Sequence, residues 1–312
     1  MGSAPCSFGV MSVMAKKRPP AFDPKSQPFK TTTLARQVAR QNLTRLNNAF
    51  WVTEHSHSLV RGSFSVLAFP SGPTDHGCYG SAPQWEMATD DQLAWVRQHV
   101  LLSAASLLEV YLSSAILAAL WANPWLVDRS LTGLPEVQFI KFRDRSPGLA
   151  KLIGEQLKPM VWGTWKDRFR KMSTIFGTLP PKFSSAQEEL QKAQELRNKI
   201  AHGFGHNASR PRRTPWEPVS PISLDASEIE KYLIIVSQVI RVADASLFLP
   251  LIGSYEFLYE FHSWSASLPD QFTRPSPAQI EPSFRRHIAA KFGSGPGKTY
   301  YKAMIAYYDA SR

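Results

Sequence analysis

The chain has 312 residues, 43% of them apolar, and its nine tryptophans and eighteen phenylalanines are enough to fill a sizeable hydrophobic core. Its two cysteines, Cys6 and Cys78, lie far apart in the sequence, which argues against a disulfide scaffold or a zinc ribbon. The N-terminal residues lack the uninterrupted apolar core of a signal peptide. We therefore expect a cytoplasmic protein that needs no cofactor.

The net charge of +11 is unevenly distributed along the chain. Residues 1–50 contain eight Lys and Arg against one acidic residue, and residues 271–312 contain seven against two. Residues 51–270 are left with a net charge of −1. Basic ends of this kind either bind nucleic acid or another polyanion, or keep the chain soluble, and composition alone favours neither.

The first third of the chain begins with a basic segment, residues 1–30, whose Pro and Lys content and lack of periodicity predict disorder. Apolar residues at helical spacing then predict a helix over 32–50. Residues 51–88 show no such pattern and are predicted to be irregular, with a short strand over 66–69. We therefore expect 31–88 to hold one helix and an irregular region.

The strongest predicted helix runs from Thr89 to Asn123. Thr89 and Gln92 have the spacing of a capping box at its start. Residues 101–121 carry Glu109 as their single charge and are long enough to cross a membrane. Their serines and one broad apolar stripe favour a buried helix of a soluble bundle instead, so we expect no membrane partner.

Capping residues, apolar periodicity and breaking Pro or Gly residues define the remaining predicted helices. Ser185 with Glu188, and Asp225 with Glu228, have the spacing of capping boxes. The predicted helices cover 146–157, 165–176, 185–203, 225–250 and 251–267. These helices and the one from Thr89 place a helical domain at 89–268, followed by a basic C-terminal extension, 269–312, with a short helix near 283–292.

The sequence Arg197-Asn198-Lys199-Ile200-Ala201-His202 lies at the end of the predicted helix 185–203. Arginine binds phosphate through a planar fork of N–H donors. Histidine is the side chain best suited to proton transfer near neutral pH. The pair is chemically sufficient for transesterification of a phosphodiester without a metal ion.

This motif resembles the Arg-(four to six residues)-His motif of HEPN domains, many of which are metal-independent ribonucleases. The resemblance extends over about 90–248, where a long first helix, a Trp- and Phe-rich segment, the motif helix and a long closing helix follow one another. Asn198 matches the family preference for a polar residue after the arginine. Glu109 resembles the acidic residue that many HEPN proteins place near that arginine.

The resemblance implies a role for each motif residue. His202 transfers protons at the attacking 2′-hydroxyl or the leaving 5′-oxygen, Arg197 stabilises charge on the phosphorane, and Asn198 orients the phosphate. It also implies a composite active site shared by two protomers, and products with a 2′,3′-cyclic phosphate and a 5′-hydroxyl. A five-residue step turns a helix by about 140°, so Arg197 and His202 do not share one strict face.

Residues 203–223 are predicted to form a loop, because they contain two glycines and four prolines. Its Arg210, Arg212, Arg213 and Trp216 could grip phosphate and stack on a base, or could simply be solvated. His202 and His206 are four residues apart, but intervening glycines break the helix that would align them. We therefore expect RNA as a partner and no metal site.

Together these features predict a mainly α protein, a HEPN-like antiparallel helical bundle with irregular, basic N- and C-terminal extensions. The function expected from the resemblance is a homodimeric, metal-independent endoribonuclease. By family analogy it would be a toxin or an anti-phage defence effector with an antitoxin or regulatory protein as a further partner. The alternative is a catalytically inactive HEPN-like scaffold or adaptor that binds nucleic acid or a partner protein.

Overall fold

The computed structural model describes residues 22–24, 32–63, 82–132, 136–143, 146–203, 222–268 and 277–311. Nearly all of these residues are helical, and none of them lies in a strand. The prediction of a mainly α fold is therefore confirmed. The predicted disordered segment 1–30, apart from residues 22–24, and the predicted strand 66–69 lie outside the described residues.

Twelve α-helices are described, in most cases separated by turns or short connections. They are α1 (Leu34–Ser63), α2 (Ala82–Ala122), α3 (Glu136–Arg143), α4 (Pro147–Val161), α5 (Trp165–Phe176), α6 (Pro181–Ser184), α7 (Gln187–Gly203), α8 (Ala226–Ala243), α9 (Leu249–Ile252), α10 (Tyr255–Ala266), α11 (Pro277–Phe292) and α12 (Lys298–Ala310). Two 3₁₀ turns, η2 (Pro124–Leu126) and η3 (Arg129–Leu131), follow α2, and a π turn, η4 (Asp244–Phe248), joins α8 to α9.

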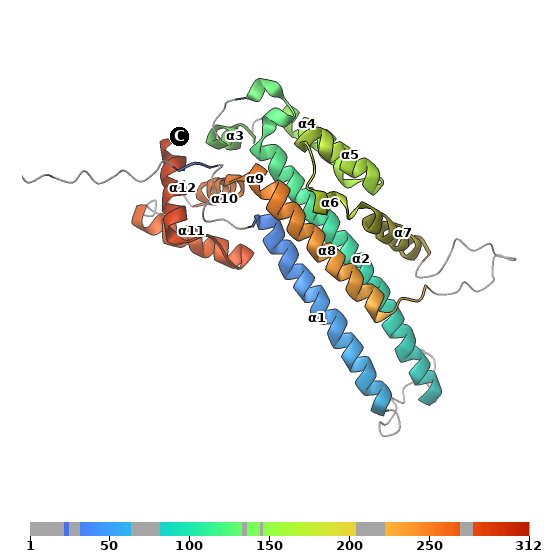
Figure 1. Cartoon of the computed structure of the whole chain (residues 1–312). Coiled ribbons are helices and arrows are strands. Elements are labelled where there is room, and N and C mark those ends of the chain that lie inside the picture. The colour runs from blue at the N-terminus through green and yellow to red at the C-terminus, as the bar shows by residue number, and fades with distance from the viewer. Residues whose placement is uncertain are drawn as a thin grey trace, which may run out of the picture.

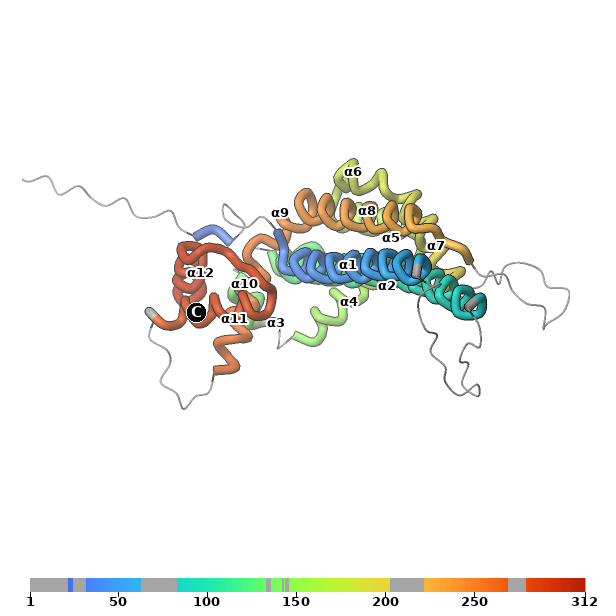
Figure 2. The backbone as a smooth tube through the Cα atoms, turned by 90° about the horizontal axis from the view of Figure 1, so that it is seen from below, coloured from blue at the N-terminus to red at the C-terminus, as the bar shows by residue number. Residues whose placement is uncertain are grey.

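The long helix α2 is the centre of the bundle. It packs against α1, α4, α7, α8, α9 and α10. α1 runs antiparallel to it, and α7 lies on the opposite side of α2 from α1 (Figure 1). The helices α10, α11 and α12 gather at the end where α1 begins (Figure 2). The candidate motif on α7 is thus held to the rest of the chain mainly through α2 and α5.

Apolar side chains of α2 are buried over much of its second half, from Val100 to Ala122. Because neighbours cover α2 on several sides, its buried residues form more than one stripe. By length and composition alone, two helical stretches could cross a membrane, Pro83–Ala122 and Ala226–Ile252. Their most apolar windows are 44% and 50% buried inside the bundle. Core helices of soluble proteins pass the same test, so the cytoplasmic location remains a prediction.

The helix predicted over 32–50 is longer than expected, because α1 continues to Ser63. Beyond Phe50 it is held to α2 by ion pairs and a histidine hydrogen bond. Arg97 binds Glu54 at 2.6 Å, the His57 ring nitrogen lies 2.8 Å from Asp90, and further pairs follow towards Ser63. Such a polar contact leaves no apolar periodicity in the sequence. The prediction that 51–88 is irregular is therefore wrong for residues 51–63 and 82–88.

The predicted capping box at Thr89 is wrong, because α2 begins seven residues earlier, at Ala82. Inside the helix, the Thr89 hydroxyl donates to the carbonyl oxygen of Glu86 at 2.8 Å. Ser185 and Glu188 do not form a capping box either, since the Ser185 hydroxyl donates to the carbonyl oxygen of Lys182. The third predicted box is confirmed: Asp225 accepts from the Glu228 amide and Glu228 accepts from the Asp225 amide.

The C-terminal region is more ordered than its composition indicates. α11 and α12 are both helical, and Tyr300, Tyr301 and Tyr308 of α12 are buried against α10 and α11. Periodicity predicted only the short helix near 283–292, because Pro and Gly residues interrupt the pattern. The division of the chain at residues 88 and 268 stays a prediction, with its first boundary inside α2.

A buried carboxylate on η4 holds the start of α1. Asp244 is fully buried, accepts from the amide and the hydroxyl of Thr33, and lies 3.6 Å from the Arg36 guanidinium. Thr33 in turn accepts from the Arg36 amide at 3.1 Å, as a helix N-cap does. Burial raises the pKa of Asp244, and the contacts with Thr33 and Arg36 oppose that shift.

We expect Thr33→Ala to lower the free energy of unfolding by about 2 kcal/mol, because it removes the N-cap of α1 and a donor to a buried carboxylate. Urea denaturation followed by circular dichroism measures this loss. Thr53→Ala is the matched control, since its hydroxyl only donates back to the Ala49 carbonyl of the same helix. Equal stability of the two variants would show that the Thr33–Asp244 contact does not support α1.

Candidate functional site

Two glutamines of α7 tie it to the start of α5. The Trp165 amide donates to Oε1 of Gln191 at 3.0 Å, and Nε2 of Gln194 donates to the Gly163 carbonyl at 3.1 Å. Leu190, Ala193 and Ile200 of α7 are buried and form part of the core. The motif helix is therefore held in one orientation by α2 and α5 together.

A carboxylate of α2 lies between two arginines that come from different helices. Oε2 of Glu109 is 3.9 Å from a guanidinium nitrogen of Arg197 on α7. Oε1 of Glu109 accepts from Nη2 of Arg168 on α5 at 3.2 Å. The structure therefore brings together Glu109 and Arg197, as the family resemblance implied, and adds Arg168. We call these three side chains the arginine–glutamate cluster.

Arg168 is the residue that sequence reasoning missed. Its side chain is 3% exposed, its Nε donates to the Gly163 carbonyl, and its guanidinium lies 4.7 Å from the Trp165 ring centre. Burial lowers the pKa of Arg168, and the hydrogen bond to Glu109 opposes that shift. The sequence did indicate a role for Arg168. It lies between Trp165 and Phe169 on the apolar face of α5, where a charged side chain requires a partner.

Arg197 connects the arginine–glutamate cluster to Asn198 by a hydrogen bond. Nη1 of Arg197 donates to Oδ1 of Asn198 at 3.0 Å, so the amide NH₂ of Asn198 is left to act as a donor. Asn198 and His202 are four residues apart and lie on the same side of α7. The contacts therefore run from Glu109 to Arg197 to Asn198, and end on the side of α7 that carries His202.

His202 is exposed in the last turn of α7. Within the described residues it makes no hydrogen bond and no ion pair. Arg197 is 33% exposed and turned towards Glu109, so the two motif residues do not converge inside one chain. The accessible imidazole of His202 is available for proton transfer. Because Arg197 of the same chain is turned towards Glu109, a guanidinium beside His202 has to come from another arginine or from a second protomer.

A small recess opens beside the arginine–glutamate cluster, with room for about one water molecule. Glu109, Arg197, Gln194, Trp165 and Tyr232 line it. Burial raises the pKa of Tyr232, the charge of Glu109 adds to the shift, and Arg197 opposes it. The phenol therefore stays protonated. With two guanidinium groups and one carboxylate, the cluster carries an excess positive charge that can attract a phosphate.

The predicted RNA-binding residues Arg210, Arg212, Arg213 and Trp216 lie outside the described residues, as does His206. In the part of the chain that the structure describes, no group of three or more His, Cys, Asp or Glu side chains could hold a metal ion.

Comparison with known proteins does not place the chain in a family. It matches no family model, no curated protein and no solved structure. The resemblance to HEPN domains therefore depends on the motif residues and the helix order alone, and membership in that family stays a prediction.

Glu109→Gln should lower the free energy of unfolding by about 2 kcal/mol, because the buried Arg168 loses its counter-charge. Equilibrium unfolding in urea measures the loss. Glu155→Gln on α4 is the control, since that glutamate is exposed, and we expect a change within about 0.5 kcal/mol. If the two variants were equally stable, Glu109 would not hold the arginine–glutamate cluster together.

Proposed function

We propose that the protein is a metal-independent endoribonuclease that cleaves RNA by attack of the 2′-hydroxyl on the adjacent phosphate. The observation that carries the proposal is the chain of contacts from Glu109 through Arg197 to Asn198, on the same helix whose last turn carries the exposed His202. This arrangement supplies a held guanidinium, an amide donor and an accessible proton-transfer group. These are the groups that a phosphodiester transesterification needs.

Each group has a defined part in the proposed reaction. His202 takes the proton from the 2′-hydroxyl or gives one to the departing 5′-oxygen. Arg197 stabilises the negative charge that develops on the phosphorane oxygens, and Asn198 orients the phosphate through its NH₂. Glu109 positions Arg197 and does not touch the substrate. The products are a 2′,3′-cyclic phosphate and a 5′-hydroxyl.

The proposal includes a homodimer with its two motif helices facing one another. Arg197 points to Glu109 within its own chain, whereas His202 is exposed five residues further on. A symmetric pair of α7 helices would let Arg197 of one protomer approach His202 of its partner. Two protomers would thus complete a site that one protomer leaves open.

Basic segments would then supply RNA affinity rather than chemistry. The excess positive charge lies in residues 1–50 and 271–312, and Arg210, Arg212 and Arg213 follow the motif within eleven residues of the sequence. Such contacts with phosphate weaken as salt concentration rises, because counterions are released on binding. A role as a toxin or anti-phage effector controlled by an antitoxin follows from the family resemblance alone.

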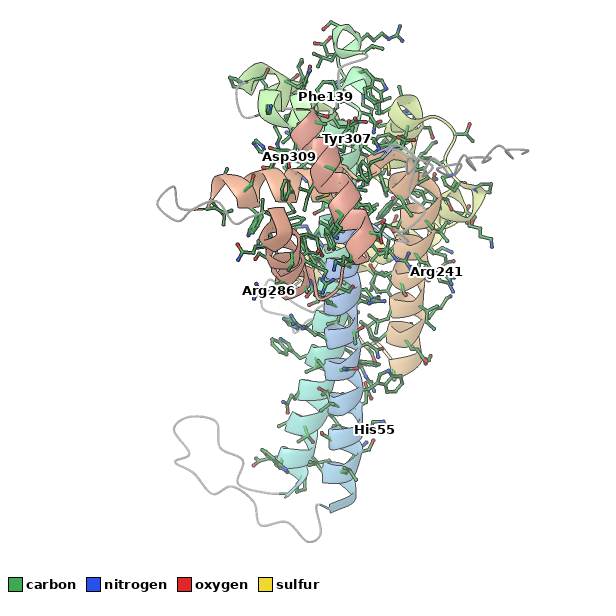
Figure 3. The ribbon with its side chains drawn as sticks, turned by 90° about the vertical axis from the view of Figure 1, so that its left-hand side faces the viewer. His55, Phe139, Arg241, Arg286, Tyr307 and Asp309 are labelled. Carbon is green, nitrogen blue, oxygen red and sulfur yellow. The ribbon has the colours of Figure 1, made fainter. Side chains whose placement is uncertain are left out.

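We expect the purified protein to cleave total RNA in the presence of EDTA, and His202→Ala to slow cleavage by about a hundredfold to ten-thousandfold. Gel analysis of the fragments measures the rate, and end-group analysis identifies the cyclic phosphate. His55→Ala is the matched control, because His55 is another exposed helical histidine, on α1 (Figure 3). It should cleave at the wild-type rate.

Undiminished cleavage by a folded His202→Ala protein would remove His202 from the mechanism. RNA binding without any cleavage by the wild-type protein would favour the alternative, a catalytically inactive helical adaptor. Cleavage that EDTA abolishes would contradict the metal-independent reaction.

The dimer proposal predicts complementation between two inactive variants. Arg197→Ala and His202→Ala homodimers should each lack activity, while dimers formed by refolding a mixture should regain it, because one intact Arg–His pair is restored across the interface. Cleavage assays and sedimentation of the same samples measure both properties. Mixed dimers as inactive as their parents would show that Arg197 and His202 act within one chain, and an active monomer would exclude the composite site.

A further inference from the structure

A second site lies on α2 away from the motif helix. A groove of about 400 Å³ runs between the first turns of α1 and the second half of α2, and α3, α10 and the end of α11 close it. This volume is in the range of pockets that hold small molecules. α1 and α7 flank α2 on opposite sides (Figure 1), so the groove is separate from the arginine–glutamate cluster.

The walls of the groove are mainly aliphatic and aromatic. Val38 and Val110, which line it from α1 and α2, are 37% and 60% exposed. Leu107 and Leu117 lie along the same wall, and Phe292 lies at the end of α11. An apolar ligand that covers these side chains would remove their surface from water, which is favourable.

One cation stands at the aromatic end of this apolar groove. The guanidinium of Arg143 lies 4.6 Å from the Trp121 ring centre and 4.1 Å from the Tyr259 ring centre. Its Nη1 donates to the Tyr255 hydroxyl at 3.2 Å. Within the described residues no carboxylate comes within salt-bridge distance of it. Both rings lie within cation–π distance of the guanidinium, and among the described residues four of its five N–H groups have no acceptor.

The two carboxylates that also line the groove are already engaged. Glu256 accepts from the backbone amides of Leu34 and Ala35 at the start of α1, at 2.8 and 3.4 Å. Glu260 binds Lys291 at 2.8 Å and faces His287 at 3.5 Å. Their charges are therefore balanced by the positive end of a helix and by a lysine. Among the described residues that line the groove, Arg143 is therefore the charged side chain without a counter-charge.

We propose that this groove binds a free fatty acid, with the carboxylate on Arg143 and the hydrocarbon chain along α1 and α2. A guanidinium and a carboxylate match in geometry and charge, and a single unbranched chain fits an open groove of this size. The site goes beyond the proposed RNA chemistry and does not depend on it. A fatty acid bound there would add contacts between α1, α2 and α10.

Calorimetric titration of the full-length protein with decanoate, below its critical micelle concentration, tests the proposal. We expect saturable binding of one decanoate, and weaker binding of decanol, which has a similar chain length but no charge. Arg143→Met keeps an extended side chain and removes the charge, and it should weaken decanoate binding by about tenfold or more. Arg241→Met, at an exposed arginine of α8 (Figure 3), is the matched control and should bind as the wild type does.

A second variant tests the position of the hydrocarbon chain. Val110→Trp introduces a large side chain at an exposed position of the groove wall, where it should block decanoate without entering the core. Circular dichroism confirms the fold of each variant. The proposal is overturned if the wild-type protein shows no saturable binding, or if decanol binds as tightly as decanoate. Unchanged decanoate affinity in either Arg143→Met or Val110→Trp would equally overturn it.

Discussion

The burial of α2 is the interaction on which the rest of the structure depends. This helix packs against α1, α4, α7, α8, α9 and α10, and its apolar residues from Val100 to Ala122 form the largest continuous part of the core. Removing apolar surface from water is the main favourable contribution to folding. Because α2 contacts so many partners, it also sets where α7 and the C-terminal helices lie relative to one another.

The polar residues of α2 gain their positions from that apolar packing. Glu109 belongs to a helix that is otherwise almost without charge in its second half, and it meets Arg168 and Arg197 from two other helices. Asp244 is placed comparably, since it is buried on η4 and contacts Thr33, the residue before α1, and Arg36 of α1. Buried charges need such partners, and wrong arrangements of the helices would leave them unpaired.

The helices that could be predicted are those whose apolar periodicity and end signals can be read from their own residues. The helices that became α4, α5 and α7 were predicted to within four residues, since apolar stripes, prolines and glycines mark them. The helix predicted over 225–250 begins within one residue of α8, but α8 ends at Ala243 and a π turn separates it from α9. The second half of α1 was not predicted, because Glu54 and His57 contact α2 through polar groups rather than apolar side chains. The early start of α2 at Ala82 was missed because Thr89 has the sequence of a cap but lies inside the helix.

By itself the sequence determined the mainly α class and the position of Arg197, Asn198 and His202 at the end of a helix, because helical spacing and residue chemistry are local properties. The pairing of Glu109 with Arg197 was implied only by the family resemblance. Only the tertiary structure decided that Arg168 joins that pair and that Arg143 stands in an apolar groove. Arg168 and Glu109 are separated by 59 positions in the sequence, and Arg143 and Tyr255 by 112. The burial of whole helices, rather than any local pattern, brings these residues together.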